Sequence, residues 1–153
     1  MRIDALGTFW HEGERVEHPR LQRALAQWLD VHPHDGRYIL SNGYDWSYVQ
    51  VDDVPFFVRT VRAAAGERQG VEATPEWAGI WLELSDSSGE LLRPRTLSQN
   101  HDGALYCRVK SGRFEAKFTP AAQLALEPWL VEVDGGVGLR IGGRTYCSSP
   151  RGA

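Results

Sequence analysis

HPRLQRALAQWL, residues 18–29, returns near the other end of the chain as TPAAQLALEPWL, residues 119–130. Position 18 maps onto position 119, and this offset of 101 residues holds without a gap across both stretches. The coinciding pairs are Pro19/Pro120, Ala24/Ala125, Leu25/Leu126, Trp28/Trp129 and Leu29/Leu130. Apolar residues recur with the spacing of one face of an amphipathic helix, and each proline stands where the first turn needs no N–H donor. The pattern predicts a helix over residues 19–30 and a related helix over residues 120–130.

The two helical stretches have similar surroundings, which indicates a repeat longer than the helix itself. A hairpin with a glycine turn precedes each one, GTFWHEGERV at 7–16 and LYCRVKSGRFEAKF at 105–118, and an apolar strand follows each one. Convergent helical patterning can produce matching leucines, whereas the matching prolines and the shared Trp-Leu pair favour duplication. The sequence therefore favours two tandem related motifs, with convergent patterning as the alternative.

Alternating apolar residues predict antiparallel strands through most of the remaining chain. GRYILS at 36–41 and YDWSYVQV at 44–51 flank Asn42-Gly43, a dipeptide typical of a tight type I′ hairpin. GIWLELSDSSGELL at 79–92 and VGLRIGGRTYCS at 137–148 alternate in the same way around a polar or glycine turn. The expected fold is α+β, with each motif a curved antiparallel sheet packed on one helix.

The domain organisation follows from where the alternation stops. Residues 66–78 lose it and gather Ala, Gly, Glu and Pro, so they are expected to form a connector. The N-terminal motif is then expected over residues 1–65 and the C-terminal motif over residues 79–153. A chain of 153 residues can bury one ordinary core, or two small cores packed against each other.

VDDVPFFV, residues 51–58, places two neighbouring carboxylates before a proline. Asp52 and Asp53 could serve acid-base catalysis, but adjacent residues of a strand point to opposite faces, and catalytic carboxylates need surroundings that separate their pKa values. Aspartate and proline both favour turns. We therefore predict a solvent-exposed turn between two antiparallel strands, in which replacing either aspartate by asparagine costs little function.

Composition indicates a folded protein, with 42% hydrophobic and 24% charged residues. No segment approaches the roughly 20 apolar residues that span a bilayer, and the first residues lack the apolar stretch of a signal peptide. We therefore expect a cytoplasmic protein without a membrane partner. Cys107 and Cys147 form no disulfide framework and no metal-binding spacing, so both are expected to be reduced thiols.

Charge is divided unevenly along the chain. Residues 1–92 carry 8 basic and 15 acidic side chains, a net charge of −7, whereas residues 93–153 carry 9 and 5, a net charge of +4. Opposite charge on the two halves permits association between subunits. A homo-oligomer is therefore one of the assemblies that the sequence allows.

Several segments resemble one bacterial family. GTFWHEG at 7–13, DGRYIL at 35–40 and VQVDDVPFFV at 49–58 are similar, in order and spacing, to the domain-of-unknown-function family twelve eighty-five. The similarity continues through IWLEL and LYCRVKSGRFEAKFTP, so it covers most of the chain. The resemblance implies two similar β-rich motifs, each carrying a helix, with a ligand-binding or signalling role. It implies no catalytic residue.

One loop departs from the family pattern. Where the family usually has Thr-Pro and then an acid after the Tyr-x-Leu strand, this chain has Asn42-Gly43-Tyr44-Asp45. A ligand contact at this loop is therefore not carried over from the family.

Basic side chains alternate along residues 105–118. Arg108 and Lys110 are expected on one face of the first strand, and Arg113 and Lys117 on one face of the second. Such a two-stranded basic surface could receive an anionic ligand, or the acidic half of another subunit. A solvated strand face without a ligand is the alternative.

Two aromatic residues beside the Asn-Gly turn, Tyr44 and Trp46, are expected to line a ligand-binding groove, whereas Trp28 and Trp129 are expected in the core. Aromatic strands with arginines also bind single-stranded nucleic acid by stacking. A net charge of −3 and the lack of an RNP-type motif argue against that partner.

Other site types find little support in the sequence. His32-x-His34 has metal-ligand residue types, but the pair needs further ligands, so solvated loop histidines are the favoured interpretation for all five. The five are His11, His18, His32, His34 and His101. GxSxG, P-loop and GxGxxG motifs are missing, and the glycines of GGVG at 135–138 precede a strand, as turn glycines do. We predict no metal, no cofactor and no catalytic residue.

These observations favour a non-enzymatic ligand-binding or signalling module, with a groove between its two motifs that receives a small-molecule or protein partner, anionic if the basic surface is used. The alternative is a small hydrolase or transferase that uses His11, Glu12 or Asp45 in the same groove. A third interpretation is a structural subunit that associates through open sheet edges.

Overall fold

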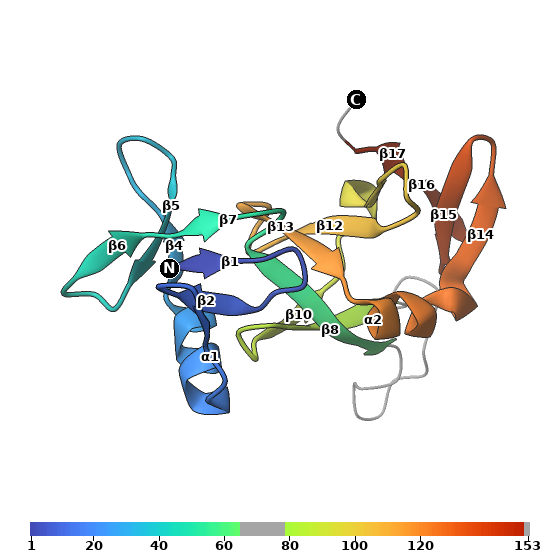
Figure 1. Ribbon diagram of the computed structural model, residues 1–153. Helices are drawn as coiled ribbons and strands as arrows, with labels where there is room; N and C mark the ends of the chain where they lie inside the picture. The colour runs from blue at the N-terminus through green and yellow to red at the C-terminus, as the bar shows by residue number, and fades with distance from the viewer. Residues whose placement is uncertain (65–78, 152–153) are drawn as a thin grey trace, which may run out of the picture.

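The computed structural model describes residues 1–64 and 79–151 (Figure 1). Strands are the commonest regular elements in these ranges and two α-helices lie among them, so the predicted α+β class is confirmed. The predicted connector over residues 66–78 lies outside the described residues. Within the described ranges, no helix has the length and apolar character needed to cross a membrane.

The first half begins with a small mixed sheet of order β3-β2-β1-β7. β2 and β3 form the predicted hairpin, and the turn residues Glu12 and Gly13 both adopt positive φ, 51° and 79°. β1 pairs antiparallel with β2 and parallel with β7, which arrives much later in the chain. The strands are β1 (Arg2–Ile3), β2 (Phe9–His11), β3 (Glu14–Arg15) and β7 (Gln50–Val51).

Helix α1 (Pro19–Gln27) follows the hairpin, as predicted. The ring of His18 caps it by accepting a backbone N–H of the first turn at 3.2 Å. Leu25 and Ala26 on its apolar face are buried, whereas Trp28, just past the helix, is 37% exposed. The expectation that Trp28 lies in the core is therefore wrong, because the helix ends one residue before it and the chain turns into a strand.

A three-stranded antiparallel sheet of order β4-β5-β6 follows α1. The predicted β5–β6 hairpin is confirmed, but its turn is not type I′, because Gly43 has positive φ (94°) and Asn42 does not. The Asn42 side-chain oxygen instead accepts the backbone N–H groups of Tyr44 and Asp45, so a side chain replaces the expected backbone geometry. The strands are β4 (Leu29–Val31), β5 (Tyr38–Ser41) and β6 (Trp46–Tyr48).

Strand β8 (Phe56–Ala63) leaves the first half and enters a seven-stranded sheet of order β10-β9-β8-β13-β12-β11-β17. It runs antiparallel to β9 and parallel to β13. The expected turn between two antiparallel strands is therefore wrong, because β7 and β8 belong to different sheets. Residues 52–55, which we call the crossing segment, connect the two sheets. Burial favours this placement, since Phe56 and Phe57 are both buried in the hydrophobic cluster. The motif boundaries at residues 65 and 79 stay a prediction.

The rest of the seven-stranded sheet contains the expected hairpins. β9 and β10 join through residues 85–88, and β12 and β13 through residues 110–112, where three residues have positive φ. The elements are β9 (Ile80–Leu84), β10 (Gly89–Leu91), the 3-10 helix η2 (Pro94–Thr96), β11 (Ser98–Gln99), β12 (Leu105–Val109), β13 (Phe114–Phe118) and β17 (Ser149–Pro150).

Helix α2 (Pro120–Ala125) begins where predicted, with the Thr119 hydroxyl accepting the N–H of Ala122 at 3.2 Å. The helix expected over residues 120–130 is divided, because Pro128 lacks an N–H and disfavours helix in the residue before it. The 3-10 turn η3 (Glu127–Trp129) completes the segment, and Trp129 packs partly buried against the core. A second three-stranded sheet then follows, with β14 (Leu130–Val133), β15 (Gly136–Ile141) and β16 (Arg144–Cys147).

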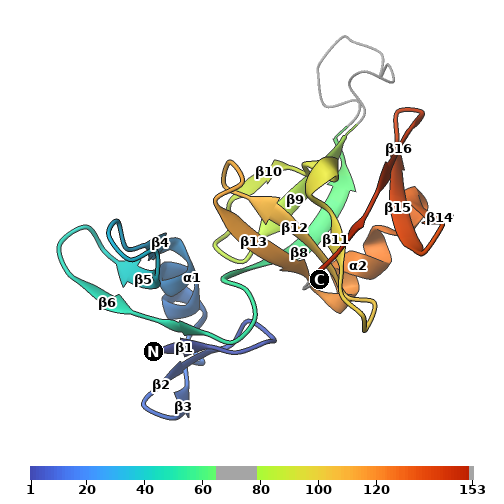
Figure 2. The same cartoon turned by 90° about the horizontal axis from the view of Figure 1, so that it is seen from above.

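Two groups of strands share one order and one set of directions. β3-β2-β1-β7 in the first half corresponds to β13-β12-β11-β17 in the second, and the last two strands of each pair in parallel. In each group a helix and a three-stranded sheet come before the last strand. Figure 2 shows the first half on one side of the molecule, and β8 among the strands of the other side.

One hydrophobic cluster runs through both halves. It contains Ile3 and Leu25 from the first half, Phe57 from β8, and Leu126 and Leu139 from the second half. The chain therefore joins its halves through side-chain packing around β8 as well as through the crossing segment.

Candidate functional site

A pocket of about 680 Å³ is lined by residues from both halves. The β1–β2 turn reaches it with Ala5 and Leu6, and β8, β13, α2 and the β11–β12 turn supply the other walls. Phe57 and Phe118, both buried, form the apolar floor, whereas Leu6 and Leu124 at the rim are 82% and 70% exposed. We call this space the inter-turn pocket. Its lining has the mainly apolar character of small-molecule sites.

The two turns beside the pocket have the same backbone geometry. Gly7 donates its N–H to the carbonyl of Asp4 at 3.1 Å, and Gly103 donates to the carbonyl of Asn100 at 3.0 Å. The two glycines have φ of 87° and 90°, in the region that glycine favours. The inter-turn pocket therefore lies between two turns of one kind, one from each half of the chain.

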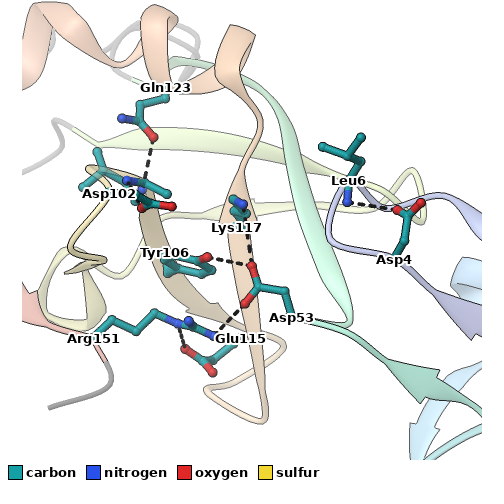
Figure 3. Close-up of polar contacts among 11 residues, drawn as sticks. Asp4, Leu6, Asp53, Asp102, Tyr106, Glu115, Lys117, Gln123 and Arg151 are labelled. Carbon is teal, nitrogen blue, oxygen red and sulfur yellow. Dashed lines mark hydrogen bonds and ion pairs between the residues drawn. The ribbon is translucent and has the colours of Figure 1, made fainter.

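Polar groups at the inter-turn pocket are few. The Gln123 side chain accepts the N–H of Leu105 at 3.1 Å (Figure 3). It also donates to the carbonyl of Gly103 at 3.0 Å. Lys117, Asp102 and Glu127 are the charged groups that line the pocket. A hydrogen bond from the Ala104 N–H lowers the pKa of Asp102. The pocket therefore offers an apolar surface beside one ammonium and two carboxylates.

Asp52 and Asp53, the adjacent carboxylates of the crossing segment, diverge. Asp52 is exposed and pairs with Arg2, whose Nη2 lies 2.7 Å from its Oδ2. Asp53 is turned toward the seven-stranded sheet and its side chain is only 16% exposed. The two do not converge on one substrate, but the expectation that both face solvent is wrong for Asp53.

Asp53 lies at the centre of a network that includes β12, β13 and the residue after β17 (Figure 3). It accepts a 2.6 Å hydrogen bond from the Tyr106 hydroxyl and a 3.0 Å bond from Arg151, and Lys117 Nζ lies 3.6 Å away. Arg151 also donates to Glu115 at 3.2 Å. Burial and the hydrogen bond to Asp53 raise the pKa of Tyr106. The network ties the crossing segment to the sheet and reaches the inter-turn pocket through Lys117.

The predicted basic surface is not a free cationic face. Arg108 donates to the Gly112 carbonyl at 3.2 Å, and Arg113 pairs at 3.0 Å with Asp30 of the first half. Lys117 is partnered by Asp53. The structure therefore places these cations beside acceptors of the same chain, and their role in ligand binding stays a prediction.

Lys110 does not share a face with Arg108, in contrast to the arrangement that strand alternation predicts. It has φ of 55° and belongs to the β12–β13 turn, so its side chain reaches the other side of the sheet. There its Nζ lies 2.7 Å from an oxygen of Asp86 and 5.5 Å from the centre of the Phe56 ring. Burial alone would raise the pKa of Asp86, but hydrogen bonds from Lys110 and Ser88 lower it. The Lys110–Asp86 ion pair therefore lies at the edge of the core, largely shielded from solvent.

Tyr44 and Trp46 lie away from the inter-turn pocket, on the β5–β6 hairpin. Tyr44 is 94% exposed at the tip of the turn. Trp46 contacts His32 and Tyr48, with ring centres 4.8 and 5.2 Å apart. The structure thus does not bring these two predicted aromatic residues together with the predicted cations.

The alternative enzymatic residues are also dispersed. His11 and Glu12 lie at the β2–β3 turn and Asp45 lies at the β5–β6 turn, and none of the three lines the inter-turn pocket. Among residues 1–64 and 79–151, no group of three or more His, Cys, Asp or Glu side chains could hold a metal ion. Cys107 is buried and Cys147 is exposed, and burial raises the pKa of Cys107.

Apart from Lys117, the residues that line the inter-turn pocket are not among those predicted from the sequence. A signal for the two turns is nevertheless present, because DALG at 4–7 and NHDG at 100–103 share the pattern Asp/Asn-x-x-Gly. Leu6 and Leu124 carry no such signal, since an isolated exposed leucine is common on protein surfaces.

Two solved structures share this fold. One is a DUF1285 family protein from Silicibacter pomeroyi DSS-3, 21% identical, with a TM-score of 0.72 over 97% of this chain and 79% of that chain. The other is a DUF1285 family protein from Shewanella baltica OS155, 18% identical, with a TM-score of 0.61 over 83% of this chain and 89% of that chain. No protein-family model and no curated protein matches the sequence. The resemblance to family twelve eighty-five is thus confirmed at the level of the fold.

Proposed function

We propose that this chain belongs to the same family, that it consists of two tandem related motifs with one helix each, and that it works as a cytoplasmic, non-enzymatic ligand-binding module. The motif duplication is supported by the matching strand orders, by the parallel β1–β7 and β11–β17 pairs, and by the 101-residue offset between the two helical stretches.

The observation that carries the binding role is the inter-turn pocket. It lies between equivalent turns of the two motifs, and its floor is apolar and wide enough for a small organic molecule. Leu6 and Leu124, which line the pocket and are exposed, are surfaces that an apolar ligand would cover. The ligand we propose has an apolar body across Phe57 and Phe118 and a polar end near Lys117.

Binding in this position would act by occupancy. A ligand that contacts the turns of both motifs stabilises the arrangement in which the two turns face each other. The stabilisation equals the difference between the ligand's binding free energy for that arrangement and for the alternatives. Lys117 lines the pocket and pairs with Asp53, so a ligand bound in the pocket would also affect the crossing segment. We propose that a protein partner recognises the stabilised arrangement, which gives the module its signalling role.

An enzymatic role receives less support. The residues proposed for it, His11, Glu12 and Asp45, lie on separate turns, whereas acid-base or nucleophilic catalysis needs groups within hydrogen-bond reach of one another. The dispersed arrangement favours binding over chemistry.

Calorimetric titration with octanoate, octanol and octylamine tests the binding role, because the three share one apolar body and differ only in the polar end. We expect at least one to bind, and the order of the three affinities shows whether Lys117 or the carboxylates of Asp102 and Glu127 dominate. Leu6→Asp and Leu124→Asp should each weaken binding about tenfold, since both place a charge beside the apolar body. Leu91→Asp is the control, because Leu91 is also exposed but lies on β10, outside the pocket.

The polar end is tested with Lys117→Met. If the ammonium receives an anionic group, this variant should remove any preference for octanoate over octanol and leave octanol affinity unchanged. The proposal fails if none of the three compounds binds, or if Leu91→Asp weakens binding as much as Leu6→Asp does.

A further inference from the structure

A second, smaller cavity lies on the side of β8 where α1 packs. Its volume is about 220 Å³, and it is lined by α1, by the start of β8 and by the β9–β10 turn. α1 and this turn are in contact, because the Gln27 side chain donates to the Asp86 carbonyl at 3.2 Å. Phe57 borders this cavity as well as the inter-turn pocket, but the polar residues of the two are different. We call this space the arginine cavity.

Two arginines line the arginine cavity, Arg23 from α1 and Arg59 from β8. In the described ranges 1–64 and 79–151, neither guanidinium has a hydrogen bond or an ion pair. This sets them apart from the predicted basic residues, such as Arg113 and Lys117, which have carboxylate partners. Both residues are exposed to solvent, and two positive charges without a carboxylate partner therefore line one cavity.

Carboxylates near the arginine cavity are engaged elsewhere. No Asp or Glu is among the residues that line it. Asp86, which stands between two lining serines in the sequence, directs its carboxylate to Lys110 and Ser88. Asp4 accepts hydrogen bonds from the Leu6 and Thr8 N–H groups and from Trp10. Neither Asp86 nor Asp4 is therefore an ion-pair partner of Arg23 or Arg59.

Hydroxyl groups complete the arginine cavity. The Ser85 oxygen accepts the N–H of Phe57 at 3.1 Å, which leaves its own O–H as a donor. Ser87 lines the cavity from the β9–β10 turn with φ of 70°, and its hydroxyl has no hydrogen-bond partner among the described residues. Two guanidiniums and two hydroxyls, without a competing carboxylate, are the donors that proteins use to bind a tetrahedral oxyanion.

We propose that Arg23, Arg59, Ser85 and Ser87 form a binding site for a phosphate group, either as free phosphate or as the phosphomonoester end of a larger molecule. The site is separate from the inter-turn pocket and does not depend on the binding role proposed for it. A phosphate held there would join α1 of the first half to β8 and the β9–β10 turn of the second sheet, because the four donors come from these elements.

Titration calorimetry of the full chain with inorganic phosphate and with phenyl phosphate tests this site. Arg23→Gln and Arg59→Gln should each weaken binding about tenfold, because each removes charge-assisted hydrogen bonds. Arg20→Gln is the matched control, since Arg20 lies on the same helix, carries the same charge and does not line the cavity. Circular dichroism of each variant separates a loss of binding from a loss of folding.

Each outcome decides the proposal. Binding of both probes supports a site for free phosphate, and binding of phenyl phosphate alone supports a site for the phosphomonoester of a larger ligand. The proposal is overturned if neither probe binds the folded wild-type chain, or if Arg20→Gln weakens binding as much as Arg59→Gln, since the attraction would then be that of overall charge.

Discussion

The Tyr106 hydroxyl donates a 2.6 Å hydrogen bond to Asp53, across a gap of 53 residues in sequence. Tyr106 is 1% exposed although it lies on the face of β12 opposite the core residue Cys107. The crossing segment and Arg151 cover that face, with the Arg151 guanidinium 3.9 Å from the centre of the tyrosine ring. The segment that joins the two halves is thus held to the larger sheet by a polar network.

Asp53→Asn should destabilise the protein more than Asp52→Asn. The asparagine keeps the shape of the side chain but removes the charge that faces Arg151 and Lys117, a loss of about 1 to 3 kcal/mol in the free energy of unfolding. Asp52 pairs with Arg2 in the exposed part of the same segment, where solvent weakens the interaction. Urea denaturation of both variants measures the difference, and equal losses would show that Asp53 is no more important than its neighbour.

Tyr106→Phe should cost about 1 kcal/mol, since it removes the hydroxyl and keeps the buried ring. If the hydrogen bond to Asp53 is the cause, the double variant with Asp53→Asn should lose less than the sum of the two single losses. A double-mutant cycle measured by urea denaturation gives this coupling energy. Strictly additive losses would mean that the two residues stabilise the fold independently.

Gly7→Ala should be more harmful than Gly103→Ala, although both glycines have positive φ in equivalent turns. At Gly103 nothing lies within 4 Å of an added Cβ, so only the backbone conformation is strained, at about 1 kcal/mol. At Gly7 the added carbon would lie 2.9 Å from the ring of Phe57, which adds about 1 to 3 kcal/mol of overpacking. Thermal denaturation compares the two, and a lower Tm for Gly103→Ala would contradict the prediction.

The Lys110–Asp86 pair predicts a specific dependence of stability on pH. Because the pKa of Asp86 is lower in the folded chain, its contribution is present above the pKa of the unfolded chain and disappears as pH falls through the folded value. Asp86→Asn should therefore be less stable than wild type by about 1 to 3 kcal/mol at neutral pH, where Lys110 would face a neutral amide. The two proteins should converge once the pH falls below the pKa of Asp86 in the folded chain, which is lower than the usual pKa of an aspartate.

Urea denaturation at several pH values measures that convergence. Asp52→Asn, whose carboxylate is exposed, provides the control for the general effect of removing one acid. If the free energy of unfolding differs between wild type and Asp86→Asn by the same amount at every pH, the Asp86 side chain stabilises the fold through packing and not through its charge.

Local patterns in the sequence determined most of the elements. The proline and the spacing of apolar residues fixed where both helices begin, and alternation with glycine turns fixed the hairpins around Gly13 and Gly112. The 101-residue offset between the two helical stretches is likewise a property of the amino-acid order alone. The elements depend on neighbours within a few residues, so local backbone preference and one-sided burial suffice to predict them.

Only the tertiary structure decided how the sheets are joined and where charges meet. Alternation showed that β8 is a strand but not that its partners are β9 and β13, because strands of similar apolar pattern compete for the same edge. In the same way, Asp53 differs from Asp52, and the paired Arg113 from the unpaired Arg23 and Arg59, through residues distant in sequence. Long-range packing brings those partners together, and no local pattern records it.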